Sequence, residues 1–290
     1  MIYDKLLLVK GSDSMRLHFK TNDYLLTWNM LYGASFAQSV HTFKQKLYKT
    51  HKDHYNNIGK DLKEMLEDIK NFIPDDDTIY NYVFDTEIFT KVKEDAEKHR
   101  LELLKMWDQN KKQLMIELKD ILKFTLKEDY NIIALDPIMD SVLSSKKCNS
   151  IAWGRRNDLD DPIKTLTDMI KVILVNDLGD FEKKYKDIID VILELAIDNE
   201  LYTRLTGKST YLTGDTSLTY LKRQIYPYFL MYLGCEQEDF PRYMMRDKIT
   251  FDIEKYVVEP DLKKLNLLEF IEFCIRNQFK IIRINQLEIL

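Results

Sequence analysis

The sequence is poor in the residues that break regular structure, with eight glycines and six prolines among 290 residues. Phosphate-binding loops and dinucleotide-binding turns need two or three glycines within a few residues, because the backbone must approach an anion without an intervening Cβ. Every glycine here stands alone, and the closest two are Gly207 and Gly214. The shortage of glycine therefore excludes most glycine-dependent nucleotide sites.

One segment, Gly207-Lys208-Ser209, looks like the end of a Walker A loop. The first glycine of that motif would stand at position 202, which is Tyr202, and no strand-like run leads into the segment. We therefore interpret Gly207 as the residue that closes a helix, where a left-handed backbone favours glycine.

Cysteine is also scarce, since the chain holds only Cys148, Cys235 and Cys274. They are far apart, odd in number and in no CxxC pair, so neither a disulfide framework nor a zinc knuckle is indicated. This cysteine usage favours a reducing, cytoplasmic location. No apolar run approaches the length of a membrane span, and the apolar stretch near Met1 is too short for a secretory signal. We expect no membrane partner.

The overall composition is that of a soluble globular protein, with 45% hydrophobic and 31% charged residues. A formal net charge of -5 is too small to indicate an acidic ligand or a nucleic-acid footprint from the whole chain. Lysine, isoleucine, asparagine, tyrosine and phenylalanine are abundant, which is typical of an AT-rich coding sequence. Our hypothesis is an origin in a low-GC bacterium, its phage or plasmid, or an AT-rich eukaryote or virus.

Residues 1–34 are predicted to form a small antiparallel β-meander. Met15, Leu17 and Phe19 alternate with polar residues, which is the period of a half-buried strand. The apolar run 24–32, ended by Gly33, is expected to be the third strand of the meander.

Residues 35–126 are predicted to form a long helical hairpin, projecting as an arm. Apolar residues recur at helical spacing on both sides of the loop around Pro74, and the stretch 86–126 lacks glycine and proline entirely. We expect the first helix to be interrupted near Gly59. The apolar stripe early in the second helix is thin, so these residues are expected to be exposed or to meet a partner: Val92, Ala96, Leu103 and Trp107.

Residues 127–290 are predicted to form a mostly helical C-terminal domain. A short buried strand is expected at 131–137, and Asp161 and Pro162 have the types of residue that begin a helix. Helices are expected at 162–175, 180–205, 217–233 and 261–277, with a closing strand at 281–284. The fold class predicted for the whole chain is α+β and predominantly α-helical.

Three histidines fall on the stripes of the predicted hairpin, His51 and His54 on the first helix and His99 on the second. If the helices pair, the three imidazoles meet in one seam, and a metal needs two or three such nitrogens plus a carboxylate. The competing interpretation, which we favour, is a wet, polar stretch of an exposed hairpin.

The segment Asn199-Glu200-Leu201-Tyr202-Thr203 has the register of the HExxH motif of metallopeptidases, with both histidines replaced. Zinc chemistry needs those two imidazoles, and asparagine and threonine do not substitute for them. The segment therefore argues against a zinc peptidase.

Two groups of residues are candidates for binding. Trp153, Arg155 and Arg156 offer an aromatic ring and two guanidinium groups that suit a phosphate or a carboxylate, unless the arginines pair with adjacent aspartates. Tyr226, Tyr228 and Tyr232 follow one another around a proline that bends their helix, and tyrosine is favoured at interfaces. Core burial is the alternative for each of these tyrosines.

No catalytic residue is predicted, and no cofactor is implied. The leading hypothesis is a non-enzymatic interaction protein, encoded by a phage or mobile element, that binds or inhibits a host protein complex and acts as a homo-oligomer. The alternative is an enzyme acting on nucleic acid or nucleotides, with Arg155, Arg156, Lys208 and Asp136 as participants. A third hypothesis is a metal-binding or pH-responsive histidine module on the hairpin.

Overall fold

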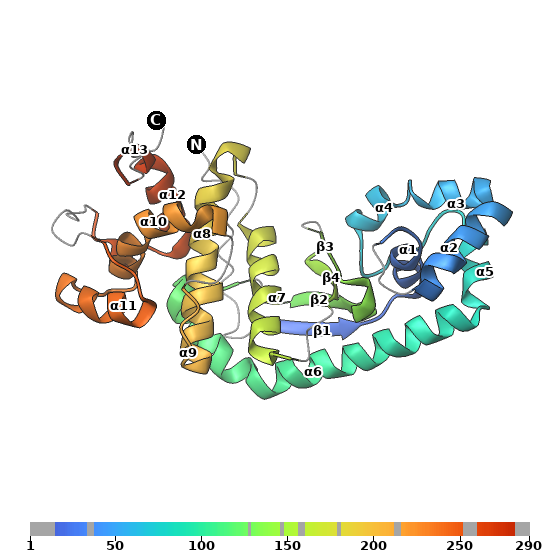
Figure 1. The fold of residues 1–290 in the computed structure, drawn as a ribbon, viewed down its shortest axis with the longest axis horizontal. Coiled ribbons are helices and arrows are strands. Elements are labelled where there is room, and N and C mark those ends of the chain that lie inside the picture. The colour runs from blue at the N-terminus through green and yellow to red at the C-terminus, as the bar shows by residue number, and fades with distance from the viewer. Residues whose placement is uncertain are drawn as a thin grey trace. The chain divides into compact units, whose positions relative to one another are not determined.

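The computed structural model describes residues 15–33, 38–126, 129–145, 148–155, 160–178, 181–211, 216–251 and 260–281. Within these ranges the chain forms two compact units (Figure 1). The sheet unit comprises the described residues of Val9–Lys111 and Leu126–Asp177. The helical unit comprises the described residues of Lys112–Thr125 and Leu178–Leu290.

A four-stranded sheet in the order β1-β2-β4-β3 organises the sheet unit (Figure 1). The strands β1, β2 and β4 are parallel, whereas the edge strand β3 is antiparallel to β4. Their bounds are Arg16–Lys20 for β1, Asp129–Ala134 for β2, Ser141–Ser145 for β3 and Ser150–Gly154 for β4. The predicted strands around Leu17 and at 131–137 are thereby confirmed.

The prediction of an antiparallel β-meander is wrong for the described residues. The strand β1 pairs in parallel with β2, which lies more than a hundred residues further along the chain. The run expected to be the third strand is the helix α1 (Asp23–Tyr32), whose first turn is capped by the Asn22 side chain at 3.0 Å from the Leu25 amide. The expected strand residues before 15 lie outside the described residues.

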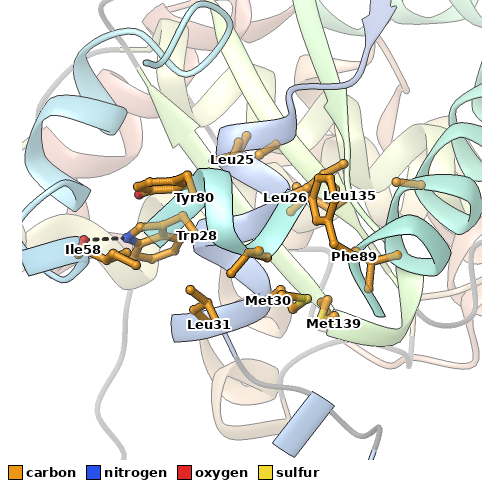
Figure 2. Close-up of a cluster of buried hydrophobic side chains, with 14 of the residues drawn as sticks. Leu25, Leu26, Trp28, Met30, Leu31, Ile58, Tyr80, Phe89, Leu135 and Met139 are labelled. Atoms are coloured by element: carbon orange, nitrogen blue, oxygen red, sulfur yellow. Dashed lines mark hydrogen bonds between the residues drawn. The ribbon is translucent and has the colours of Figure 1, made fainter. Parts of the chain in front are cut away.

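The hydrophobic core of the sheet unit forms around α1 (Figure 2). Leu25 to Leu31 are all buried, so this helix is surrounded on every side. The indole nitrogen of Trp28 donates to the carbonyl of Ile58 at 3.2 Å. Leu135 and Met139 reach the same cluster from the segment that follows β2. Burial of this apolar surface is the main stabilising contribution to the unit.

Several short helices complete that core and gather at one end of the sheet unit (Figure 1). The predicted interruption near Gly59 is confirmed, because the first half of the expected hairpin is divided into separate helices. They are α2 (Gln38–Thr50), α3 (Lys52–Ile58), α4 (Leu62–Glu67) and α5 (Thr78–Phe84).

The long helix predicted for 86–126 is confirmed as α6 (Glu87–Leu122). Its N-terminal part packs in the core of the sheet unit, where Phe89, Val92 and Ala96 join the cluster around α1. Leu103 and Trp107, for which the prediction was exposure or contact with a partner, are buried as well. The sheet-unit part of the predicted arm therefore packs into a shared core and does not project as a free hairpin.

The helix α7 (Pro162–Asp177) begins as predicted, because the Asp161 carboxylate accepts the Lys164 amide proton at 3.0 Å. It contacts β3, and Tyr130 of β2 donates a hydrogen bond to Asp177 at its last turn. These contacts place α7 in the sheet unit.

The helical unit contains one long run of helical backbone, made of four consecutive elements. The run comprises η2 (Lys183–Tyr185), α8 (Lys186–Leu193), the π-helix η3 (Glu194–Leu201) and α9 (Tyr202–Thr206). Gly207 closes α9 with a φ of 73°, which confirms its predicted role.

In the sheet unit, the short helix η1 (Pro137–Met139) follows β2. The helical unit also contains η4 (Thr216–Leu218), α10 (Thr219–Tyr232), η5 (Gln237–Asp239), α11 (Phe240–Asp247), η6 (Leu262–Lys264), α12 (Leu267–Arg276) and α13 (Gln278–Ile281). The predicted closing strand is wrong at Ile281, which ends α13, and 282–284 lie outside the described residues.

The secondary structure confirms an α+β, predominantly helical fold. The domain boundaries 1–34, 35–126 and 127–290 stay predictions. The two compact units are defined by contacts in space, and each is assembled from separate stretches of chain.

The buried Thr27 provides a test of this core. Its hydroxyl is fully buried and has no hydrogen-bond partner among the described residues. Thr27→Val keeps the shape and removes the unpaired polar group, so we expect the free energy of unfolding to rise by about 1–2 kcal/mol. Urea unfolding measures the change, with Thr90→Val on the exposed side of α6 as the control near zero. A loss of stability in Thr27→Val contradicts the expectation.

Candidate functional site

Four tyrosines and a histidine form an exposed aromatic surface on the sheet unit. Tyr32 ends α1, Tyr48 lies on α2, Tyr55 on α3 and Tyr82 on α5, and His51 stands between α2 and α3. We call these five residues the aromatic surface. Contacts between α2 and α3 and between α3 and α5 hold the helices together.

The rings of the aromatic surface form two groups of contacts, one of Tyr32, Tyr55 and Tyr48 and one of His51 and Tyr82. Tyr55 lies between its neighbours, with ring centroids 5.3 Å from Tyr32 and 5.6 Å from Tyr48. The His51 ring lies 4.7 Å from the Tyr82 ring, and Tyr32 stacks on the buried Trp28 at 6.0 Å. Because the rings support each other, their orientation is fixed before any partner arrives.

Backbone hydrogen bonds fix two of these rings further. The hydroxyl of Tyr32 donates to the carbonyl of Tyr55, and the hydroxyl of Tyr55 donates to the carbonyl of Leu31 at 2.9 Å. Burial raises the pKa of Tyr55 to about 12 and raises that of Tyr32, so both hydroxyls stay protonated as donors. Tyr48 and Tyr82 are the open members, with 43% and 45% of their surface exposed.

A second group of polar residues lies inside the helical unit, on and around η3. Every residue of this π-helix is buried, including Glu194, Asp198, Asn199 and Glu200. Such helices are rare and occur often at functional sites. The Lys222 ammonium of α10 forms an ion pair with Glu194, and both side chains are almost completely buried.

Glu200 and Asp247 in this interior group are also paired with cationic side chains. Glu200 accepts from Arg204 at 2.9 Å and from Arg246 at 3.2 Å. Asp247 accepts from Arg246 at 2.8 Å and from the Tyr226 hydroxyl. Burial and the Asp247 carboxylate raise the pKa of Tyr226, so its hydroxyl remains a donor. These internal pairs are typical of a structural network.

The register that resembles HExxH is part of this network. Asn199 donates to the Thr210 carbonyl at 2.6 Å, and the Thr203 hydroxyl donates to the Lys208 carbonyl at 3.1 Å. Glu200 is engaged by two guanidinium groups, which would repel a metal cation. The geometry agrees with the interpretation that this segment is no zinc site.

The three histidines predicted as metal ligands have different partners. His51 stacks on Tyr82, His54 pairs with Asp76 at 3.2 Å, and the buried His99 bonds the Leu135 carbonyl at 2.9 Å. Across the described ranges, no group of three or more His, Cys, Asp or Glu side chains is placed to hold a metal ion.

The other predicted binding residues are mostly internal. Trp153 lies in β4 and is fully buried, with the Arg155 guanidinium 5.4 Å from its ring. Tyr226 and Tyr232 are buried in α10, where Tyr232 donates to the Ile121 carbonyl, and Tyr228 is partly exposed. Arg156 lies outside the described residues. The aromatic surface was missed because its members come from four helices.

Asp136 is a buried carboxyl group at the carboxyl end of β2. It accepts the Ile138 amide proton at 3.0 Å and is 4% exposed. Burial is the largest influence and raises its pKa to about 6, and the charge of Asp95 acts in the same direction. The charges of His99 and Lys91 and the hydrogen bond from Ile138 act in the opposite direction.

Comparisons with protein-family models, with curated proteins and with solved structures find no match. Among the described residues, no helix combines the length and the apolar character needed to cross a membrane. Functional proposals for this chain therefore rest on its own residues.

The Glu194–Lys222 pair tests whether the interior network is structural. Lys222→Met leaves a buried carboxylate without its ion-pair partner, so we expect a loss of about 3–5 kcal/mol in the free energy of unfolding. Adding Glu194→Leu removes that carboxylate and should recover most of the loss, as measured by urea unfolding. Lys186→Met, which breaks an exposed pair with Asp190, is the control with a change below about 1 kcal/mol. Equal losses in the single and double variants contradict this account.

Asp136 gives a pH dependence with a defined sign. Its folded pKa of about 6 exceeds the ordinary aspartate value of 3.8, so the folded chain binds this proton more tightly than the unfolded chain does. This contribution to stability is complete below about pH 4 and is lost as pH rises through about 6. Asp136→Asn keeps an oxygen for the Ile138 amide and removes the titration.

We therefore expect Asp136→Asn to flatten the decline in the free energy of unfolding between about pH 4 and 7. At pH 7 the variant should gain about 1–3 kcal/mol over the parent chain. Urea unfolding across this pH range measures both quantities. An unchanged slope would show that Asp136 does not titrate in this window.

Proposed function

We propose that this protein is non-enzymatic and acts by binding another protein through the aromatic surface. The observation that carries the proposal is the set of packed rings of Tyr32, Tyr48 and Tyr55 together with the His51–Tyr82 pair, of which Tyr32, Tyr48 and Tyr82 are exposed. Tyrosine contributes large contact area and a polar tip with little side-chain entropy to lose, and it is enriched at energetic centres of interfaces.

The order already present in this surface favours binding. An interface loses free energy when it has to immobilise flexible side chains, so rings that are fixed beforehand bind at lower cost. The Tyr32 and Tyr55 hydroxyls are held by backbone carbonyls, which supports this preorganisation. Tyr48 and Tyr82 then supply exposed ring area, at 43% and 45% of their surface.

The finer parts of the proposal come from composition. An AT-rich coding sequence with an interaction surface fits a phage or mobile element whose product binds or inhibits a host protein complex in the cytoplasm. A homo-oligomeric form belongs to the same proposal and is tested by light scattering.

A nucleic-acid or nucleotide enzyme is the second candidate, and one observation favours it. Asp136 and Arg155 follow the neighbouring parallel strands β2 and β4, at the edge where many α/β sheets bind ligands. Against this, the Asp136 carboxyl group already caps the Ile138 amide, and the described residues bring no second carboxylate into hydrogen-bond contact with it.

Site-specific photo-crosslinking tests the interaction directly. A benzophenone side chain is placed at position 48 or 82 of the full chain, and at 101 on α6 as the control. Leu101 is 52% exposed and lies outside the aromatic surface. We expect the same protein to be crosslinked in the native host from 48 and 82 but not from 101. Equal crosslinking from all three positions, or none, contradicts the proposed surface.

Once that protein is identified, Tyr48→Ala should weaken its binding by about tenfold or more, as expected for an exposed aromatic anchor at an interface centre. Leu101→Ala is the matched control for a change in exposed apolar area. Far-ultraviolet circular dichroism confirms that both variants are folded.

A further inference from the structure

Three members of the aromatic surface, Tyr48, His51 and Tyr55, lie in a basic stretch of a chain that is acidic overall. Residues 38–60 contain five of the 43 lysine and arginine residues but only one of the 48 acidic residues. Their formal charge is +4, whereas the whole chain carries -5. The stretch that contains α2 and α3 therefore has a local excess of positive charge.

Three lysines of this stretch are exposed beside the rings. Lys46, Lys49 and Lys52 form no ion pair with any described residue. The Lys52 ammonium lies 6.0 Å from the centre of the Tyr48 ring, so positive charge directly adjoins the open aromatic area. Many other charged side chains of the protein are paired, as in the exposed Lys186–Asp190 pair.

We propose that the aromatic surface binds an acidic segment of another protein, with these three lysines as its charged rim. This inference rests on the proposed function and specifies the chemistry of the partner. Rim charges accelerate encounter with an oppositely charged partner and fix its orientation more than they add affinity. The net negative charge of the remaining chain disfavours an acidic partner over most of its surface, which favours binding here.

The arrangement of the rings favours a protein over a single-stranded nucleic acid. Bases bind by stacking on free aromatic faces in a positively charged groove. Here Tyr32 is stacked on Trp28, and Tyr55 lies between Tyr32 and Tyr48, so Tyr32 and Tyr55 offer little free ring face for a base. What remains exposed is mixed ring surface, as found in protein interfaces.

The charge also argues against a second copy of this chain as the occupant. In the commonest dimers the same surface meets itself across a two-fold axis. Such a pairing would bring the exposed lysines of both copies together at the rim, where like charges repel. An acidic partner neutralises them instead.

A random peptide library displayed on phage tests the partner's chemistry without knowledge of its identity. The full-length protein is immobilised and the bound peptides are sequenced. The same selection is made with Lys46→Glu/Lys49→Glu/Lys52→Glu, the rim variant. We expect Asp and Glu to be enriched among peptides bound by the parent chain and not among those bound by the rim variant.

A charge-matched control separates rim chemistry from net charge. Lys98, Lys105 and Lys112 are exposed on α6 and form no ion pair with any described residue. Their triple replacement by Glu changes the net charge equally. A synthetic peptide from the selection should bind about tenfold more weakly to the rim variant and nearly unchanged to this control, by fluorescence anisotropy. Its affinity should also fall as salt concentration rises.

The outcomes distinguish this inference from the proposed function. If Tyr48→Ala abolishes peptide binding but the rim variant does not, the aromatic surface binds protein and the acidic partner is wrong. If neither change weakens the bound peptides, both proposals are wrong. If oligothymidylate binds more tightly than the peptide and its binding needs the rim lysines, the occupant is a single-stranded nucleic acid. If the parent chain forms a dimer that only the rim variant loses, the occupant is a second copy of the chain.

Discussion

The burial of residues 25–31 of α1 is the constraint on which the rest of the sheet unit depends. These residues leave no side facing solvent, so the surrounding helices and the sheet have to pack around them. Trp28 hydrogen-bonds to α3 at Ile58, and Tyr24 packs edge-on against Tyr80 of α5 at 5.5 Å. These contacts fix the helices that carry the aromatic surface, because a packed core adopts one arrangement rather than many.

Sequence patterns predicted the elements that have one buried face and one exposed face. The strand β1 alternates and the helix α6 shows helical spacing, so both were found with nearly correct bounds. The helix α1 is buried on all sides, and a continuous apolar run has no period that distinguishes strand from helix. The one local signal of a helix was Asn22, which caps its first turn.

The candidate site was predicted less well than the fold, because a sequence pattern does not show whether a side chain points to the core or to solvent. A run of aromatic residues such as Tyr226 to Tyr232 indicates apolar area, but not whether a ring faces the core or solvent, and both of these rings are buried. Tyr32 and Tyr55 are 23 residues apart and meet only through tertiary packing. The density of lysine in 38–60 was the signal in the sequence that pointed toward this surface.

The two units use their charges in opposite ways, and the contrast bears on function. In the helical unit, Glu194, Glu200 and Asp247 are buried and each accepts from a cationic side chain, because an unpaired buried charge is strongly destabilising. On the sheet unit, Lys46 and Lys49 remain in water without ion pairs to described residues, where the unpaired state costs little. The internal ion pairs stabilise the fold. The exposed lysines beside the fixed aromatic rings stabilise it no more than neutral polar side chains would. Their physical consequence appears only when an oppositely charged surface approaches, and that is the basis for assigning them to recognition.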